Sequence, residues 1–125
     1  MNAYGDNKID KKLINWSVAI PMIEKALGLT LYEWQKTYLN YGPWSGMECY
    51  QRGTGKTTIY CVKLALERTK PIKVEEIWKH RDEDHGSGYN DWFRDFFLEI
   101  WHKLKKERLP VVEIIARKNL RGGLG

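Results

Sequence analysis

The chain has 125 residues, which suits one domain with a single modest hydrophobic core. Hydrophobic residues make up 42% of it and charged residues 30%, a composition that favours a folded, soluble protein and excludes disorder as its main state. No apolar run approaches the roughly 20 residues that a membrane-spanning helix needs, and the polar first residues predict no secretory signal.

The net charge of +5 indicates a basic surface, which favours a polyanionic partner. Six tryptophans and seven tyrosines are many for this length. They could fill the core, stack on bases or occupy the pockets of a partner. Cys49 and Cys61 have no metal-binding or redox spacing, so we expect reduced thiols and a cytosolic protein.

The N-terminal part predicts an arm followed by two helices. Residues 1–15 are expected to form a flexible arm, and Ser17 to cap a short helix over residues 21–27. Thr30 is expected to open a second helix, because Thr30 and Glu33 have the spacing of a capping box. The apolar face of this second helix would consist of Leu31, Trp34 and Tyr38.

A glycine-rich segment separates a predicted strand over residues 47–51 from an apolar helix over residues 59–66. Its glycines permit a sharp turn and allow backbone N–H groups to approach an anion closely. The N-terminus of the following helix presents unpaired N–H groups and a positive partial charge. This pattern predicts a phosphate-binding loop, formed by Arg52, Gly53, Thr54, Gly55, Lys56, Thr57 and Thr58.

In such a loop, Lys56 would reach the outer phosphates of Mg-ATP and the Thr57 hydroxyl would bind the magnesium ion. The consensus is G-x-x-x-x-G-K-[ST], and Tyr50 takes the place of its first glycine. The alternative is a glycine turn before a helix whose lysine and threonines are ordinary surface residues. The intact R-G-T-G-K-T core before an apolar helix favours the phosphate loop.

The region after the loop helix is less regular. Ile72 and Val74 alternate with lysine, which suits a short strand, but residues 75–79 could equally be helical. Residues 80–88 are predicted to form a loop. This loop contains two histidines and several acidic residues that could gather a metal ion, but a polar surface loop is the favoured interpretation.

The clearest helix spans residues 92–104 and should end before Pro110. Residues 111–116 are predicted to form a buried strand. Alternating strands and helices favour an α/β domain over residues 16–116, with a small truncated P-loop-like core and a short parallel sheet flanked by helices. Residues 117–125 would be a basic, glycine-rich tail.

The helix over residues 92–104 carries an unusually large apolar stripe. We expect this stripe to be core first of all, and any part left exposed to mark a partner site. Its residues are Trp92, Phe93, Phe96, Phe97, Ile100, Trp101 and Leu104. The basic residues that we expect to bind nucleic acid or another partner are Lys103, Lys106, Arg117, Lys118 and Arg121.

The segment Leu31-Tyr32-Glu33-Trp34-Gln35-Lys36, followed by Arg52-Gly53-Thr54-Gly55-Lys56-Thr57, resembles the start of the ATPase domain of phage terminase large subunits. The resemblance covers residues 29–68. It implies that Gln35 binds adenine and that Arg52, Lys56 and Thr57 surround the phosphates. The later aromatic helix and strand are similar to small prophage proteins, which implies the cytoplasm of a bacterial host.

The chain departs from that family at the acidic residues that ATP hydrolysis would need. A terminase motor carries an acidic pair after a later apolar strand, whereas the strand here carries Glu113 and ends without such a pair. Asp82, Glu83 and Asp84 fall in the predicted loop and follow no apolar strand. We therefore expect no fixed carboxylate beside the phosphate loop, and little or no ATP hydrolysis by the monomer.

Two functions follow from these observations. The first is a non-enzymatic module on a degenerate P-loop scaffold that binds nucleic acid or a host protein–nucleic-acid complex, for example as an inhibitor of a CRISPR effector nuclease. The second is a nucleotide-binding protein, or a subunit of a terminase-like ATPase whose missing carboxylates come from another chain. The incomplete hydrolytic site and the basic charge favour the first, and the intact phosphate-loop core favours the second.

Overall fold

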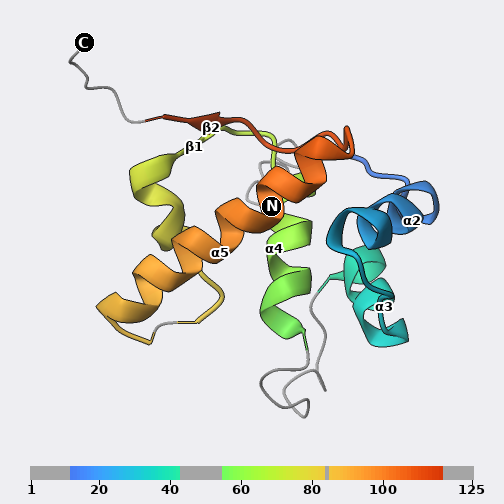
Figure 1. Ribbon diagram of the computed structural model, residues 1–125, viewed down its shortest axis with the longest axis horizontal. Helices are drawn as coiled ribbons and strands as arrows, with labels where there is room; N and C mark the ends of the chain where they lie inside the picture. Colours follow the sequence, from blue (N-terminus) through green and yellow to red (C-terminus); the bar gives the residue numbers. More distant parts are fainter. Residues whose placement is uncertain (1–11, 43–54, 84, 117–125) are drawn as a thin grey trace, which may run out of the picture.

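The computed structural model describes residues 12–42, 55–83 and 85–116. Within these ranges the chain is mostly helical, and its strands form a two-stranded parallel sheet (Figure 1). The elements in chain order are α2 (Trp16–Leu27), α3 (Glu33–Tyr41), α4 (Lys56–Glu67), β1 (Ile72–Lys73), the 3₁₀ helix η2 (Val74–His80), α5 (Ser87–Lys106) and β2 (Ile114–Ile115).

Helix α4 lies at the centre of the fold. It packs against α5 on one side and against α3 on another, while α5 extends beyond it to contact both η2 and α2 (Figure 1). Both central helices bury an apolar stripe with helical periodicity, which places the core between them. The buried residues of the two helices are Ile59, Cys61, Val62, Ala65 and Leu66 of α4, and Phe93, Phe97, Ile100, Trp101 and Leu104 of α5.

The strands are shorter than predicted. Ile72 pairs with Ile114 and Lys73 with Ile115, so only two residues of the strand predicted over residues 111–116 join the sheet. The N–H of Val112 donates to the carbonyl oxygen of Ala65 in α4 at 2.7 Å, which takes that residue out of the ladder. The indole N–H of Trp101 donates to the Val112 carbonyl oxygen, also at 2.7 Å.

The caps of α2 and α3 differ from the predictions. Ser17 lies in the first turn of α2, because the chain becomes helical at Trp16 and the Asn15 carbonyl already accepts from the backbone of the first turn. Helix α3 begins at Glu33, after Tyr32 and not after Thr30. The Tyr32 N–H donates to Oε1 of Gln35 at 2.8 Å, so a glutamine supplies the contact that we predicted from Thr30 and Glu33.

The α/β prediction holds in coarse form, as a helical protein with a short parallel sheet. The strand predicted over residues 47–51 and the tail predicted over residues 117–125 lie outside the described residues, as does most of the predicted arm. Residues 75–79 are helical, within η2. In the described part of the chain, no helix combines the length and apolar character that a membrane span requires.

Tyr60 fastens the end of η2 to α4. Its hydroxyl donates to the carbonyl oxygen of His80 at 2.5 Å. Burial, and then the negative charge of Asp82, raise the pKa of Tyr60 from 10.0 to about 12. The neutral hydroxyl is thus favoured in the folded state, and it holds the chain where η2 runs into the following loop.

We expect the free energy of unfolding to decrease as pH rises from 10.0 to about 12. The pKa of Tyr60 is higher in the folded protein than in the unfolded chain, so its contribution is complete below pH 10.0 and is lost as pH passes through the folded value. Urea unfolding at several pH values measures this slope. Tyr60→Phe should flatten it, whereas Tyr41→Phe, at a side chain that is 82% exposed, should leave it unchanged.

Candidate functional site

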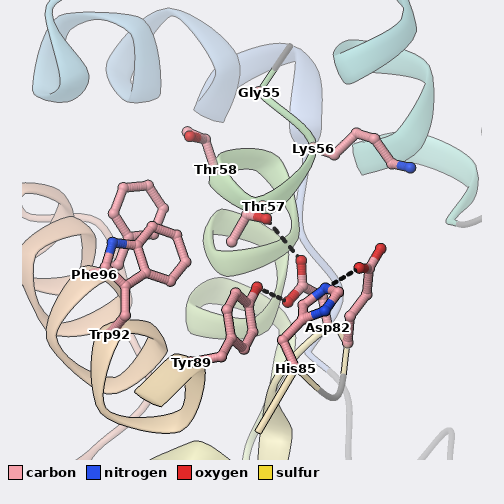
Figure 2. Close-up of a pocket in the computed structure, with 10 residues that line it drawn as sticks. Gly55, Lys56, Thr57, Thr58, Asp82, His85, Tyr89, Trp92 and Phe96 are labelled. Atoms are coloured by element: carbon pink, nitrogen blue, oxygen red, sulfur yellow. Dashed lines mark hydrogen bonds and ion pairs between the residues drawn. The ribbon is translucent and has the colours of Figure 1, made fainter. Parts of the chain in front are cut away.

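A cavity of about 640 Å³ opens between the start of α4, the loop after η2 and the first turns of α5. Polar and charged groups from α4 and the loop line one part of the cavity, and aromatic rings from α5 line the other part (Figure 2). The lining residues are Gly55, Lys56, Thr57, Thr58, Asp82, Glu83, His85, Tyr89, Trp92 and Phe96.

Gly55 sets the start of α4. Its φ of +96° lies in the left-handed region, which side chains rarely adopt, and its carbonyl oxygen accepts the N–H of Ile59 at 3.0 Å. A Cβ at this position would stand 2.5 Å from Nε2 of Gln35. Both the backbone conformation and this close approach favour glycine at residue 55. Because Gly55 is the N-cap of α4, it determines where the helix begins beside the cavity.

Asp82 lies directly beside the start of α4. Oγ1 of Thr57 donates to Oδ2 of Asp82 at 2.7 Å, and the Tyr89 hydroxyl donates to Oδ1 of the same carboxylate (Figure 2). Burial, and then the hydrogen bond to Asp82, raise the pKa of Tyr89 above its ordinary range, so Tyr89 remains a donor at neutral pH. Two hydroxyl groups from different helices therefore hold one carboxylate in place.

The prediction that no carboxylate would be fixed beside the phosphate loop is wrong for Asp82. The acidic pair of a terminase motor directly follows an apolar strand, whereas here a 3₁₀ helix separates β1 from Asp82. The bond between Tyr60 and His80 places the end of η2 against α4, and the loop then passes the first turn of α4. The sequence feature that could have indicated this carboxylate is the acidic run that begins at Asp82. It follows the short strand after one intervening helical segment.

Glu83 and His85 border the acidic part of the cavity. Nε2 of His85 is within hydrogen-bonding distance of Oε1 of Glu83, and the imidazole meets the Tyr89 ring edge-on with centroids 4.8 Å apart. Asp84 lies outside the described residues. Among the residues that the structure describes, no group of three or more His, Cys, Asp and Glu side chains could together hold a metal ion.

The oxygen atoms of Thr57 and Asp82 fit a magnesium ion that arrives with a nucleotide. Mg²⁺ prefers oxygen ligands, keeps several waters, and is commonly held by one or two carboxylates together with substrate phosphates. A hydroxyl oxygen and a carboxylate oxygen 2.7 Å apart, at a helix N-terminus, could form the protein's share of such a set if a nucleotide supplied the remaining ligands. A cluster of several acidic side chains is not needed for this type of site.

Gln35, to which the resemblance assigns adenine, uses its amide within the protein. Its side chain is buried, with 4% exposed, and it does not line the cavity. Oε1 accepts from the Tyr32 N–H, and Nε2 donates to the Gly55 carbonyl oxygen at 3.2 Å. In this structure Gln35 links the start of α3 to the start of α4, and its contact with adenine stays a prediction.

The other predicted residues are only partly brought together. Thr58 lines the cavity, and the Lys56 side chain extends to the side of α4 away from the Trp92 and Phe96 rings (Figure 2). Lys103 and Lys106 are in the last turn of α5, away from the residues of this helix that line the cavity, and Lys103 pairs with Glu99 at 3.3 Å. Arg52, Gly53, Thr54, Arg117, Lys118 and Arg121 lie outside the described residues.

Comparisons of the chain with protein-family models, with curated proteins and with solved structures found no match. The resemblance to terminase motors and the module that binds nucleic acid or a host nucleoprotein complex therefore remain predictions.

Replacing Gln35 by methionine should lower the free energy of unfolding by about 1–3 kcal/mol, because two partly buried backbone groups lose their hydrogen-bond partner. Chemical denaturation measures this loss. Lys36→Met, on the same helix and closer to solvent, should change stability by no more than about 0.5 kcal/mol. Equal stability of the two variants would contradict a structural role for the Gln35 amide.

Proposed function

We propose that this protein binds a nucleoside triphosphate together with Mg²⁺ at the N-terminus of α4. The observation that carries this proposal is the contact between Thr57 Oγ1 and Asp82 Oδ2 at 2.7 Å. In phosphate-binding loops, the threonine or serine after the lysine shares the magnesium ion with an aspartate from elsewhere in the chain. A surface threonine after a simple glycine turn would not need a half-buried aspartate beside it.

Each group at the start of α4 has a role in this proposal. The backbone N–H groups of the first turn have no partner within the helix, so they can donate to phosphate oxygens. Lys56 would bring its ammonium group to the outer phosphates, and Thr57 and Asp82 would hold the metal. When bound, the magnesium ion would neutralise negative charge on the phosphates.

We propose binding without efficient hydrolysis. Phosphoryl transfer to water depends on a positioned base or water-orienting group. Asp82 accepts hydrogen bonds at both of its oxygen atoms, and Glu83 is paired with His85. The carboxylates that line the cavity are therefore engaged in contacts within the protein, and the isolated chain would serve as a nucleotide-dependent binding protein or as one part of a larger ATPase.

Calorimetric titration with Mg-ATP should show binding that Lys56→Ala abolishes and that Asp82→Asn weakens by at least about tenfold. Chelation of magnesium should reduce the affinity of the unmodified protein to that of Asp82→Asn. Lys36→Ala, a lysine substitution on α3, serves as the control and should bind normally. Affinity that is unaffected by Lys56→Ala, or that is independent of magnesium, would contradict the proposal.

Phosphate release from ATP should not exceed the rate of the Lys56→Ala variant under the same conditions. The physical reason is that Asp82 would hold the metal and Glu83 is paired with His85, so neither of these two carboxylates is left to orient the attacking water. A sensitive phosphate assay at saturating Mg-ATP measures this rate. Turnover clearly above that of Lys56→Ala, and lost again in Glu83→Gln, would show that Glu83 leaves His85 and acts on the attacking water.

A further inference from the structure

Three aromatic side chains of α5 form a continuous wall in the cavity. Tyr89, Trp92 and Phe96 are three and four residues apart, so they lie along one face of the helix. The Trp92 and Phe96 rings are stacked, with centroids 4.8 Å apart and planes inclined by 12°, and the Tyr89 and Trp92 centroids are 5.3 Å apart. We call these three residues the ring wall.

Tyr89 and Phe96 pack against the hydrophobic core as well as lining the cavity, whereas Trp92 is not part of the core. The neighbouring residues Phe93 and Phe97 point into the core and are fully buried. Trp92 is 46% exposed, although it lines a cavity and is stacked on another ring. This is the part of the large apolar stripe of α5 that the domain does not cover, and it faces the same cavity as Thr57 and Asp82 (Figure 2).

We propose that the ring wall binds the base of the nucleotide by stacking, with Trp92 as its main contact. This inference rests on the proposed function, because it concerns the same pocket. A triphosphate held at the start of α4 by Lys56 and Thr57 leaves its sugar and base to occupy the rest of the cavity. The apolar surface that the cavity offers there is the ring wall.

The chemistry of the wall predicts little discrimination between bases. Every base has an aromatic face, so stacking tolerates exchange of one base for another. Selective recognition would need hydrogen-bonding groups that match a base edge. The Tyr89 hydroxyl already donates to Asp82, and both ends of the Gln35 amide are bonded to backbone groups. We therefore assign this pocket to nucleoside triphosphates as a class, with adenine and guanine bound alike.

Three magnesium-loaded probes test the assignment by calorimetry: ATP, GTP and inorganic tripolyphosphate, which has the phosphates without a base. ATP and GTP should bind within about threefold of each other. Trp92→Ala should weaken both by about 5- to 150-fold, the range expected for the loss of one base–ring stack, and should leave tripolyphosphate unchanged. Trp92→Tyr should recover most of the affinity, because it restores a ring.

Trp78→Ala is the matched control, since Trp78 is 37% exposed and does not line the cavity. It should leave all three affinities unchanged. Thermal unfolding of each variant checks that the fold persists, and the Trp92→Tyr variant keeps the test decisive if Trp92→Ala is unstable.

The outcomes separate this inference from the proposed function. If ATP and tripolyphosphate both bind but Trp92→Ala leaves ATP affinity unchanged, the ring wall is not the base site and the proposed function stands. If Trp92→Ala weakens tripolyphosphate as much as ATP, Trp92 merely supports the fold of the pocket and the inference fails. If no probe binds the unmodified protein, both fail.

A single-stranded oligonucleotide tests the mononucleotide assignment. Tight binding of the oligonucleotide in place of Mg-ATP, lost in Trp92→Ala, would overturn that assignment.

Discussion

The burial of α4 between α5 and α3 is the constraint on which the pocket depends. The apolar side chains of α4 must face its neighbours, so the direction of the helix is fixed and its polar first turn is left at the rim of the core. Lys63 strengthens the contact with α3, because its ammonium group donates to the Leu39 carbonyl oxygen at 2.7 Å. It also donates to Glu67 of its own helix at 2.8 Å. The positive end of the helix dipole thus points at a place where the fold provides space and where a carboxylate is already present.

The Asp82 carboxylate is the second component of the pocket, after the N-terminus of α4. Its surroundings are as important as its position. A carboxylate loses hydrogen bonds from water when the protein partly encloses it. The hydroxyl groups of Thr57 and Tyr89 donate hydrogen bonds that replace some of those from water. These donors are neutral, so the negative charge remains available to a cation. Among the residues that the structure describes, the groups that bond Asp82 are hydroxyls. A metal would therefore compete there with neutral donors and not with a described arginine or lysine.

Local patterns in the sequence predicted the parts of this arrangement that depend on neighbouring residues. The start of α4 follows from a glycine that must have positive φ before an apolar helix, and α5 follows from the periodicity of its large side chains. The position of Asp82 could not be predicted in this way, because it depends on how η2 packs against α5 and on the hydrogen bond from Tyr60 of α4 to His80. The two-residue strands were overestimated for a related reason: Val112 satisfies its N–H with a helix carbonyl, a partner that no strand pattern indicates. The resemblance to terminase motors implies that Gln35 binds adenine, whereas in this structure its amide bonds to the backbone of Tyr32 and Gly55.

The parallel pairing of Ile72 with Ile114 has a consequence for how this chain folds. Parallel neighbours cannot be joined by a tight turn, and here the crossover between them contains η2 and the whole of α5. The entropy of closing so long a loop opposes the pairing until α5 has docked on α4. Two short strands should therefore come together late, after the helices. The sheet would act as the final closure of the domain, and its loss would be an early event in unfolding that releases the segment after α5 while the central helix pair persists.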